Sequence, residues 1–216
     1  MRTSGELKDI AISALEGKWG QAVGLTFVMA VLESVASGLS YIPIVGAVFP
    51  LIAMPLSFGF AVAFLNNLRG GEARIETIFA GYKDFGRVFL TQLIMGIYVC
   101  LWSLLLVVPG VIKAISYTMT PFVLNDNPEL SYDAAISRSS RLMQGHKMEY
   151  FVFVLSFAGW FVLSVLTMFI GFLWLAPYFQ TAKAAFYHEL LAEHDEDIAV
   201  VIDDDTTPAE GLRPLE

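Results

Sequence analysis

Long runs of apolar residues, separated by shorter polar segments, dominate the chain. Crossing the hydrocarbon core of a membrane takes about 20 mostly apolar residues as a helix, and fewer than about 17 is marginal. Six runs approach or reach this length, at residues 21–40, 44–65, 87–108, 110–124, 149–170 and 172–191. The pattern therefore predicts an all-α fold, a polytopic membrane helix bundle with about six transmembrane helices.

The fourth and sixth runs are the weakest of the six. The fourth is short and contains Lys113, and the sixth contains Gln180, Lys183, His188 and Glu189. Charged side chains are costly inside hydrocarbon. Four full spans with two half-inserted helices is therefore an open alternative.

The connections between the runs alternate in kind. The turns at 41–44, 108–110 and 171–172 contain no charged residue, whereas the other connections are long and polar. Because cytoplasmic loops carry an excess of Lys and Arg, we expect a multi-pass protein with both termini in the cytoplasm. The basic residues that precede the first run or lie in the polar connections are Arg2, Lys8, Lys18, Arg69, Arg74, Lys83, Arg87, Arg138, Arg141 and Lys147.

A short pattern, glycine followed within two positions by lysine, occurs three times at a spacing of 64 residues. Segments that begin at Pro55 and Pro177 also resemble each other. A repeat of this length changes the expected fold. We predict three tandem units at about 3–66, 71–124 and 131–191, each an amphipathic helix, a glycine break and a transmembrane hairpin. The repeated residues are Gly17 with Lys18, Gly81 with Lys83, and Gly145 with Lys147.

The segments before these glycines have the pattern of amphipathic helices. Apolar residues between Leu7 and Leu15 recur with helical spacing, and Thr3 with Glu6 can form a capping box. Ser131 is the expected N-cap of the corresponding helix in the third unit. Such helices suit the membrane surface, or they pack against the cytoplasmic ends of the spans. The pattern leaves both alternatives open.

Composition supports the membrane class and separates a tail from the body. Hydrophobic residues make up 56% of the chain and charged residues 16%, against about a half and a quarter in soluble domains. Residues 192–216 contain nine acidic residues and one arginine, while residues 1–191 contain twelve of each sign. We therefore expect an integral membrane helical domain at 1–191 and an acidic, disordered cytoplasmic tail at 192–216.

The motifs in the sequence that could indicate catalysis or metal binding are incomplete. HELLAEH at 188–194 resembles a zinc-peptidase helix, but the second histidine of HExxH falls at Ala192. NDNPELS at 125–131 is oxygen-rich, yet it lacks the spacing of a calcium loop and has the pattern of a turn before a helix. We expect no enzyme activity, no catalytic or metal-binding residues, no cofactor and no nucleic-acid partner.

Four polar residues inside the predicted spans are the candidate functional residues. An ionisable side chain in hydrocarbon is a functional hypothesis by default. One interpretation is a polar pathway across the membrane; the alternative is a structural ion pair between Glu33 and Lys183, or side chains that reach a wet interface. The four residues are Glu33, Lys113, Gln180 and Lys183.

Several stretches resemble a bacterial integral membrane protein family catalogued as domain of unknown function 975. The similarity runs from about residue 5 to 191. It implies a polytopic protein of the bacterial cytoplasmic membrane, with no established reaction, substrate or catalytic residue. The stretches are GKWGQAVG, PLSFGF, LWSLLLVVPGVIKAISYTMTPFVLNDNPELS, SRLMQGHK, and the run from SFAGW to PYFQTAKAAFYHEL.

Two functions from different classes fit these patterns. The first is a non-enzymatic membrane protein that organises lipids or a membrane partner, with membrane lipids and a membrane or cytoplasmic protein as its partners. The alternative is a small transporter or channel component. The tandem units lack the inverted symmetry of many secondary transporters, although parallel repeats also occur in transporters.

Overall fold

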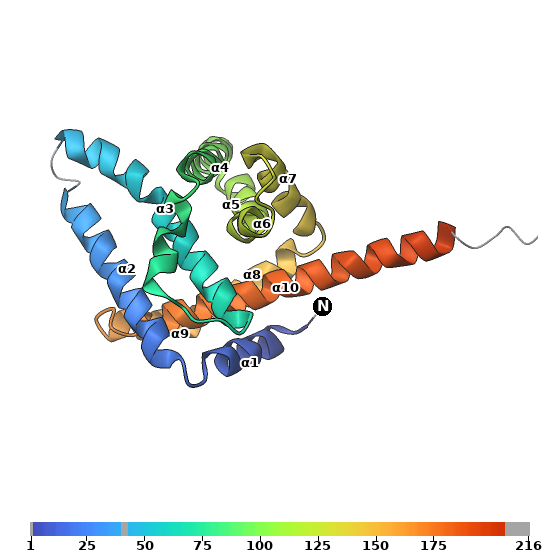
Figure 1. Cartoon of the computed structure of the whole chain (residues 1–216), viewed down its shortest axis with the longest axis horizontal. Coiled ribbons are helices and arrows are strands. Elements are labelled where there is room, and N and C mark those ends of the chain that lie inside the picture. Colours follow the sequence, from blue (N-terminus) through green and yellow to red (C-terminus); the bar gives the residue numbers. More distant parts are fainter. Residues whose placement is uncertain (1, 40–42, 206–216) are drawn as a thin grey trace, which may run out of the picture.

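The structure is a computed structural model that describes the backbone of residues 2–39 and 43–205, and the side chains of residues 2–38, 53–104 and 106–194. Within these residues every regular element is a helix. The elements in chain order are α1 (Ser4–Leu15), α2 (Trp19–Leu39), α3 (Pro43–Leu68), η1 (Ile75–Tyr82), α4 (Phe85–Leu105), α5 (Val107–Tyr117), α6 (Thr120–Asp126), α7 (Tyr132–Leu142), α8 (Lys147–Leu155), α9 (Ala158–Leu166) and α10 (Phe172–Asp205) (Figure 1).

Four helical stretches of the described chain are long and apolar enough to cross a membrane. They are Trp19–Gly38, Phe85–Leu104, Val107–Asp126 and Lys147–Leu166. The all-helical class is thus confirmed, and the apolar helices are compatible with a membrane location. The predicted fourth run meets this criterion, whereas α3 contributes a shorter described stretch and α10 contributes none. The arrangement with six spans stays a prediction.

Two of the predicted spans are broken helices. Between α5 and α6 the break falls at Thr118 and Met119, and Pro121 lies at the start of α6. A proline ring clashes with the carbonyl four residues earlier, which here belongs to Tyr117, the last residue of α5. The run that begins near Lys147 breaks at Ser156, whose hydroxyl donates to the carbonyl of Phe153 at 2.6 Å.

The predicted helix caps are present. Thr3 Oγ1 accepts from the Glu6 amide at 3.4 Å, and the Thr3 amide donates to Glu6 Oε2 at 2.7 Å. The Thr3 amide and the Thr3 hydroxyl both donate to the Glu6 carboxylate, and these two bonds hold the pKa of Glu6 below its ordinary value. Ser131 Oγ accepts from the amide of Ala134 at the start of α7. The capping box and the Ser131 cap are both confirmed.

The apolar face of α1 is buried within the protein. Leu7, Ala11 and Leu15 are almost fully buried, and α1 packs against α10 and α3. The apolar residues of α7 are buried in the same way. This burial favours packing against the other helices over insertion of these faces into a membrane surface.

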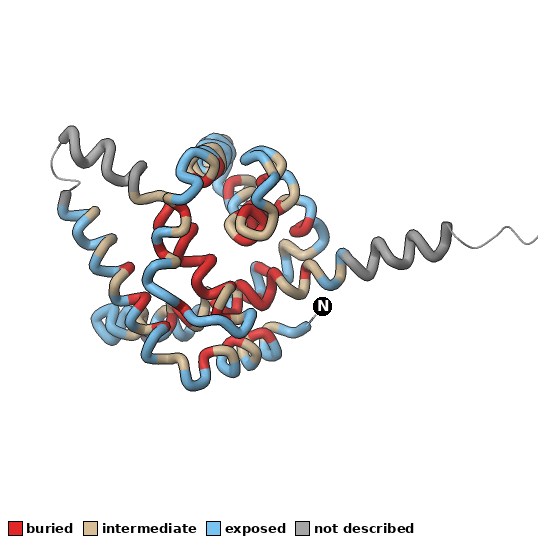
Figure 2. The backbone as a smooth tube through the Cα atoms, in the orientation of Figure 1, coloured by how far each residue is buried: buried red, intermediate tan, exposed pale blue. Residues whose placement is uncertain are grey.

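The centre of the protein is formed by α3, α6 and α10, which carry most of the buried residues in Figure 2. Phe64, Phe122 and Phe186 are all fully buried there. They occupy equivalent positions in the three predicted units. The tandem repeat itself stays a prediction.

The three repeated glycines play two different structural roles. Gly17 and Gly145 have φ angles of +72° and +86° and follow α1 and α7, a conformation that glycine adopts without strain. Gly81 instead lies in η1, where a Cβ would stand 2.6 Å from the carbonyl oxygen of Pro55. The second copy therefore uses its glycine for close packing against α3.

The last helix extends beyond the predicted end of the membrane domain. The tail is predicted to begin at residue 192, and α10 continues past that position through Asp205. No proline or glycine interrupts the sequence between Tyr178 and Thr207, so nothing local ends the helix there. The remainder of the predicted tail, residues 206–216, lies outside the described residues. The division into a membrane domain and a tail stays a prediction.

Candidate functional site

An Arg–Asp pair joins the ends of α3 and α6. Arg69 directly follows α3, and Asp126 is the last residue of α6. Arg69 Nη1 donates to Asp126 Oδ1 at 2.7 Å, and Nη2 donates to Asp126 Oδ2. This bidentate geometry is the strong form of a charge-assisted contact. The hydrogen bond to Asp126 raises the pKa of Arg69 above its ordinary value.

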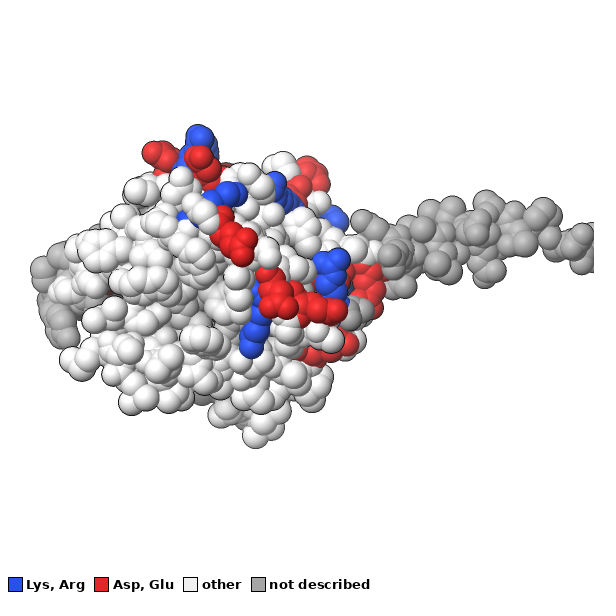
Figure 3. Space-filling view, turned by 90° about the horizontal axis from the view of Figure 1, so that it is seen from below, with Lys and Arg blue, Asp and Glu red and all other residues white. Residues whose placement is uncertain are grey.

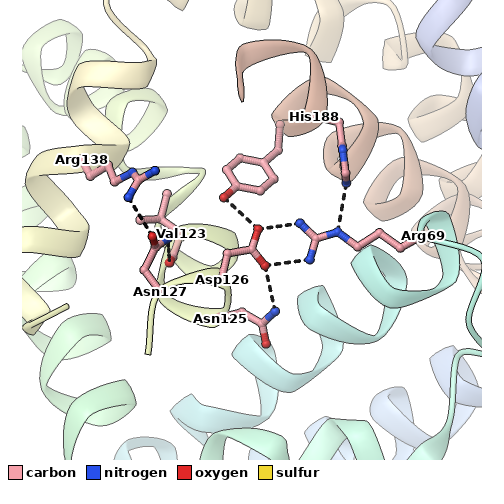
Figure 4. Close-up of polar contacts among 8 residues, drawn as sticks. Arg69, Val123, Asn125, Asp126, Asn127, Arg138 and His188 are labelled. Atoms are coloured by element: carbon pink, nitrogen blue, oxygen red, sulfur yellow. Dashed lines mark hydrogen bonds and ion pairs between the residues drawn. The ribbon is translucent and has the colours of Figure 1, made fainter. Parts of the chain in front are cut away.

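Two residues of α10 extend this pair into a cluster (Figure 4). Tyr187 Oη donates to Asp126 Oδ2 at 3.1 Å, and Arg69 Nε donates to His188 Nε2 at 3.1 Å. Because His188 accepts at Nε2, its neutral ring carries the proton on Nδ1. Asn125 Nδ2 adds a donor to Asp126 Oδ1 at 3.2 Å. We call Arg69, Asn125, Asp126, Tyr187 and His188 the polar cluster.

Neighbouring polar groups fix the segment that follows α6. Arg138 Nη1 donates to Asn127 Oδ1 at 2.7 Å, and Asn127 Nδ2 donates to the carbonyl of Val123 at 2.8 Å (Figure 4). Arg87 Nη1 donates to the carbonyls of Asn127 and Leu130. These contacts hold the turn from α6 to α7. The donors and acceptors are paired with one another, an arrangement that suits a structural role.

The sequence pattern did not reveal the polar cluster. Arg69 counted only as one basic residue of a polar connection, and Asp126 belonged to a predicted turn. They are 57 positions apart in the sequence. The available signal was that each charge lies at the end of a helix, five residues after Phe64 and four residues after Phe122 in successive predicted units.

The structure places Glu33 and Lys183 in two adjoining hollows. Glu33 is exposed and lines a hollow of about 380 Å³ between α2 and α3. Lys183 lines a hollow of about 440 Å³ between α3, α4, α5 and α10. Ser57 borders both, and its hydroxyl contacts Gln92 Oε1 at 3.2 Å. Among the described side chains, no ion pair joins Glu33 to Lys183.

The other candidate polar residues have different surroundings. The Lys113 ammonium lies 5.3 Å from the ring centroid of Trp102 and 5.9 Å from that of Tyr117. The Lys183 ammonium lies 5.5 Å from the ring centroid of Phe122. Gln180 Oε1 is buried without a hydrogen-bond partner. The four predicted residues therefore do not form one site.

The lysines of the repeated pattern are also separated in space. Lys18 Nζ donates to the carbonyl of Gly71 at 2.7 Å, while Lys83 is exposed and Lys147 begins α8. In the part of the chain with described side chains, no group of three or more His, Cys, Asp or Glu side chains is placed to hold a metal ion. His188, from the rejected HExxH pattern, contacts Arg69 in the polar cluster.

Comparison with known proteins identifies a family without a described activity. The family described as "Protein of unknown function (DUF975)" matches residues 1–119 and 104–194. No curated protein and no solved structure matches the chain. The two matched segments together cover all six predicted spans and the polar cluster. The chain therefore belongs to the DUF975 family.

Proposed function

We propose that the chain is a multi-pass, non-enzymatic protein of the bacterial cytoplasmic membrane that organises lipids or a membrane partner. The observation that carries this proposal is the large exposed apolar surface. Leu104, Leu166 and Met168 are 84%, 74% and 82% exposed, and such surfaces in soluble proteins are rare and small. Figure 3 shows a broad area without charged side chains beside a band of charged ones.

The paired state of the polar cluster supports a structural role in place of catalysis. Asp126 receives hydrogen bonds from Arg69, Asn125 and Tyr187. A carboxylate that already accepts these hydrogen bonds has few acceptor sites left to bind a substrate. The cluster instead ties α3, α6 and α10 together, at the end of the protein that the basic residues assign to the cytoplasm.

Membrane topology is the first test of this proposal. With Cys100 replaced by serine, single cysteines at Lys83 and Val108 report the two predicted sides. A membrane-impermeant maleimide should label Val108→Cys in intact spheroplasts and Lys83→Cys only after permeabilisation. The reverse pattern would overturn the orientation. Release of the protein from membranes by alkaline carbonate would overturn the membrane location itself.

Transport is the second candidate function, and the shared border at Ser57 favours it. Ser57 lines both the Glu33 hollow and the Lys183 hollow. Flux into liposomes that depends on both Glu33 and Lys183 would support transport.

The matched variants are Glu33→Gln and Lys183→Met, with Glu76→Gln as the control on exposed η1. If flux exists and either hollow variant abolishes it while the protein stays folded, the organising function is overturned. If no tested ion or small solute crosses, and the purified protein retains lipid or a partner, the transport alternative is overturned.

A further inference from the structure

A hollow of about 410 Å³ lies between α1, the start of α2, α9 and the start of α10. Its walls are almost entirely apolar. Three of the four tryptophans in the chain, Trp19, Trp160 and Trp174, line it. We call it the tryptophan hollow. Its volume is in the range of ordinary small-ligand sites, and it is separate from the polar cluster and from the Ser57 hollows.

The outer rim of the tryptophan hollow faces away from the protein. Trp160, Leu163 and Trp174 are each about half exposed although they line the hollow. Beyond them, the turn from α9 to α10 presents Met168 and Phe169, which are 82% and 66% exposed. The hollow therefore opens onto the uncharged surface, not toward water-facing charged residues.

A basic group stands beside the inner rim. Lys8 and Ile12 are one turn apart on α1, and Ile12 lines the hollow. The Lys8 ammonium lies 4.5 Å from the ring centroid of Phe157. Phe157 packs edge-on against Tyr178, another lining residue, at 5.2 Å between ring centroids. Lys8 is thus one residue removed from the lining of the hollow, through Ile12 along α1 and through Phe157 to Tyr178. A cation beside an apolar hollow follows the order of a lipid headgroup and its chain.

The Lys8 ammonium has capacity for a further ligand. It donates one hydrogen bond, to the carbonyl oxygen of Ser156 at 2.7 Å, and an ammonium group has three donors. Within the described residues no carboxylate is ion-paired to it. Partial burial lowers the pKa of Lys8 below its ordinary value, as expected for a cation at an interface without an acidic partner.

We propose that the tryptophan hollow binds an acyl chain of an anionic phospholipid, whose phosphate group is held by Lys8. Figure 3 shows the boundary between charged and uncharged surface on the side of the protein where α1 and α9 lie in Figure 1. Tryptophan is enriched at such boundaries because its ring is apolar and its N–H is polar. The proposal rests on the proposed membrane location and names the lipid class.

Tryptophan fluorescence provides a direct test. The Trp102→Phe protein retains tryptophan only in the hollow, so quenching of its emission reports this site. The protein is purified in a detergent without bromine and titrated with phosphatidylglycerol or phosphatidylcholine that carries brominated acyl chains. Saturable quenching at a lower concentration of phosphatidylglycerol is expected.

Charge variants separate the headgroup contact from contact with acyl chains alone. Lys8→Gln should raise the half-saturating phosphatidylglycerol concentration about five-fold, which corresponds to about 1 kcal/mol for one basic residue. Asp9, which adjoins Tyr178, should repel the phosphate, so Asp9→Asn should tighten binding. Lys83→Gln is the control, because Lys83 is exposed and follows η1, which does not line the hollow.

Equal quenching by the two lipids, or quenching without saturation, would overturn the proposal, as would an unchanged Lys8→Gln titration. A count of bound lipids by native mass spectrometry repeats the comparison without substituting Trp102. Carbonate extraction of the membranes from which each protein is purified distinguishes the two failures. A protein that resists carbonate but shows no lipid preference retains the proposed membrane location and loses only the lipid site.

Discussion

The segment of α10 from Trp174 to His188 has two ends that lie in opposite surroundings. Near Tyr187 and His188, polar side chains from three helices pair with one another. About 20 Å away, at about 1.5 Å per residue, Trp174 and the preceding turn have half or more of their surface exposed. The first end is stabilised by contacts within the protein. The second end presents apolar side chains to its surroundings.

Loss of Asp126 is the change expected to weaken the polar end most. Asp126→Ala removes the partner of Arg69 and the acceptor of Tyr187. We expect a loss of about 2 to 3 kcal/mol in the free energy of unfolding, within the range for hydrogen bonds to charged groups. Unfolding in mixed detergent micelles, followed by helical circular dichroism, measures the change.

Asp84→Ala is the matched control for Asp126→Ala. Asp84 also pairs with an arginine, Arg87, but its side chain is 54% exposed, against 18% for Asp126. Exposed ion pairs contribute about 0 to 1 kcal/mol. Equal losses in the two variants would contradict the view that burial makes the polar cluster the stronger contact.

A test at the apolar end uses the closeness of α9 and α10. A Cβ on Gly171 would stand 2.8 Å from Ser164 Cα, so Gly171→Ala forces the two helices apart. We expect a loss of about 1 to 3 kcal/mol, the usual cost of overpacking, in the same unfolding experiment.

Gly159→Ala in α9 is the control, because a Cβ there meets nothing within 4 Å. It should leave the stability unchanged or raise it, since alanine favours helix. If Gly171→Ala is equally harmless, the turn at this end is looser than the structure indicates.

The smallest change in the free energy of unfolding is expected from a substitution in the strained turn between α9 and α10. Met168 has a φ angle of +54° and is 82% exposed. Glycine adopts this conformation without steric cost, so Met168→Gly should raise the free energy of unfolding by up to about 1 kcal/mol. Leu166→Gly, in the regular part of α9, should lower it by about the same amount. A loss in both variants would show that the exposed side chain matters more than the backbone.

The sequence pattern predicted what depends on local spacing. The cap at Thr3, the cap at Ser131 and the apolar spans of α2 and α4 follow from neighbouring residues, and the structure contains them. The break after Tyr117 was also readable, because Pro121 lies four positions later, yet the run was predicted as one helix. The mean hydropathy of the run is taken over the residues on both sides of the break, so it does not reveal the break.

Contacts between distant segments were not predictable from the same patterns. The pairing of Arg69 with Asp126 and the separation of Glu33 from Lys183 both depend on how α3, α6 and α10 cross. Periodicity determines which face of a helix is apolar, but it does not determine which other helix packs against that face. For that reason the predicted Glu33–Lys183 pair is absent from the described residues, and the polar cluster was missed.

The length of α10 has a mechanical consequence. Its 34 residues form a rod of about 51 Å, whereas a hydrocarbon core is about 30 Å thick. Arg69 and Asp126 clamp this rod at Tyr187 and His188, between its two ends. These contacts therefore hold the helix near its midpoint, and residues 189–205 extend about 25 Å beyond them.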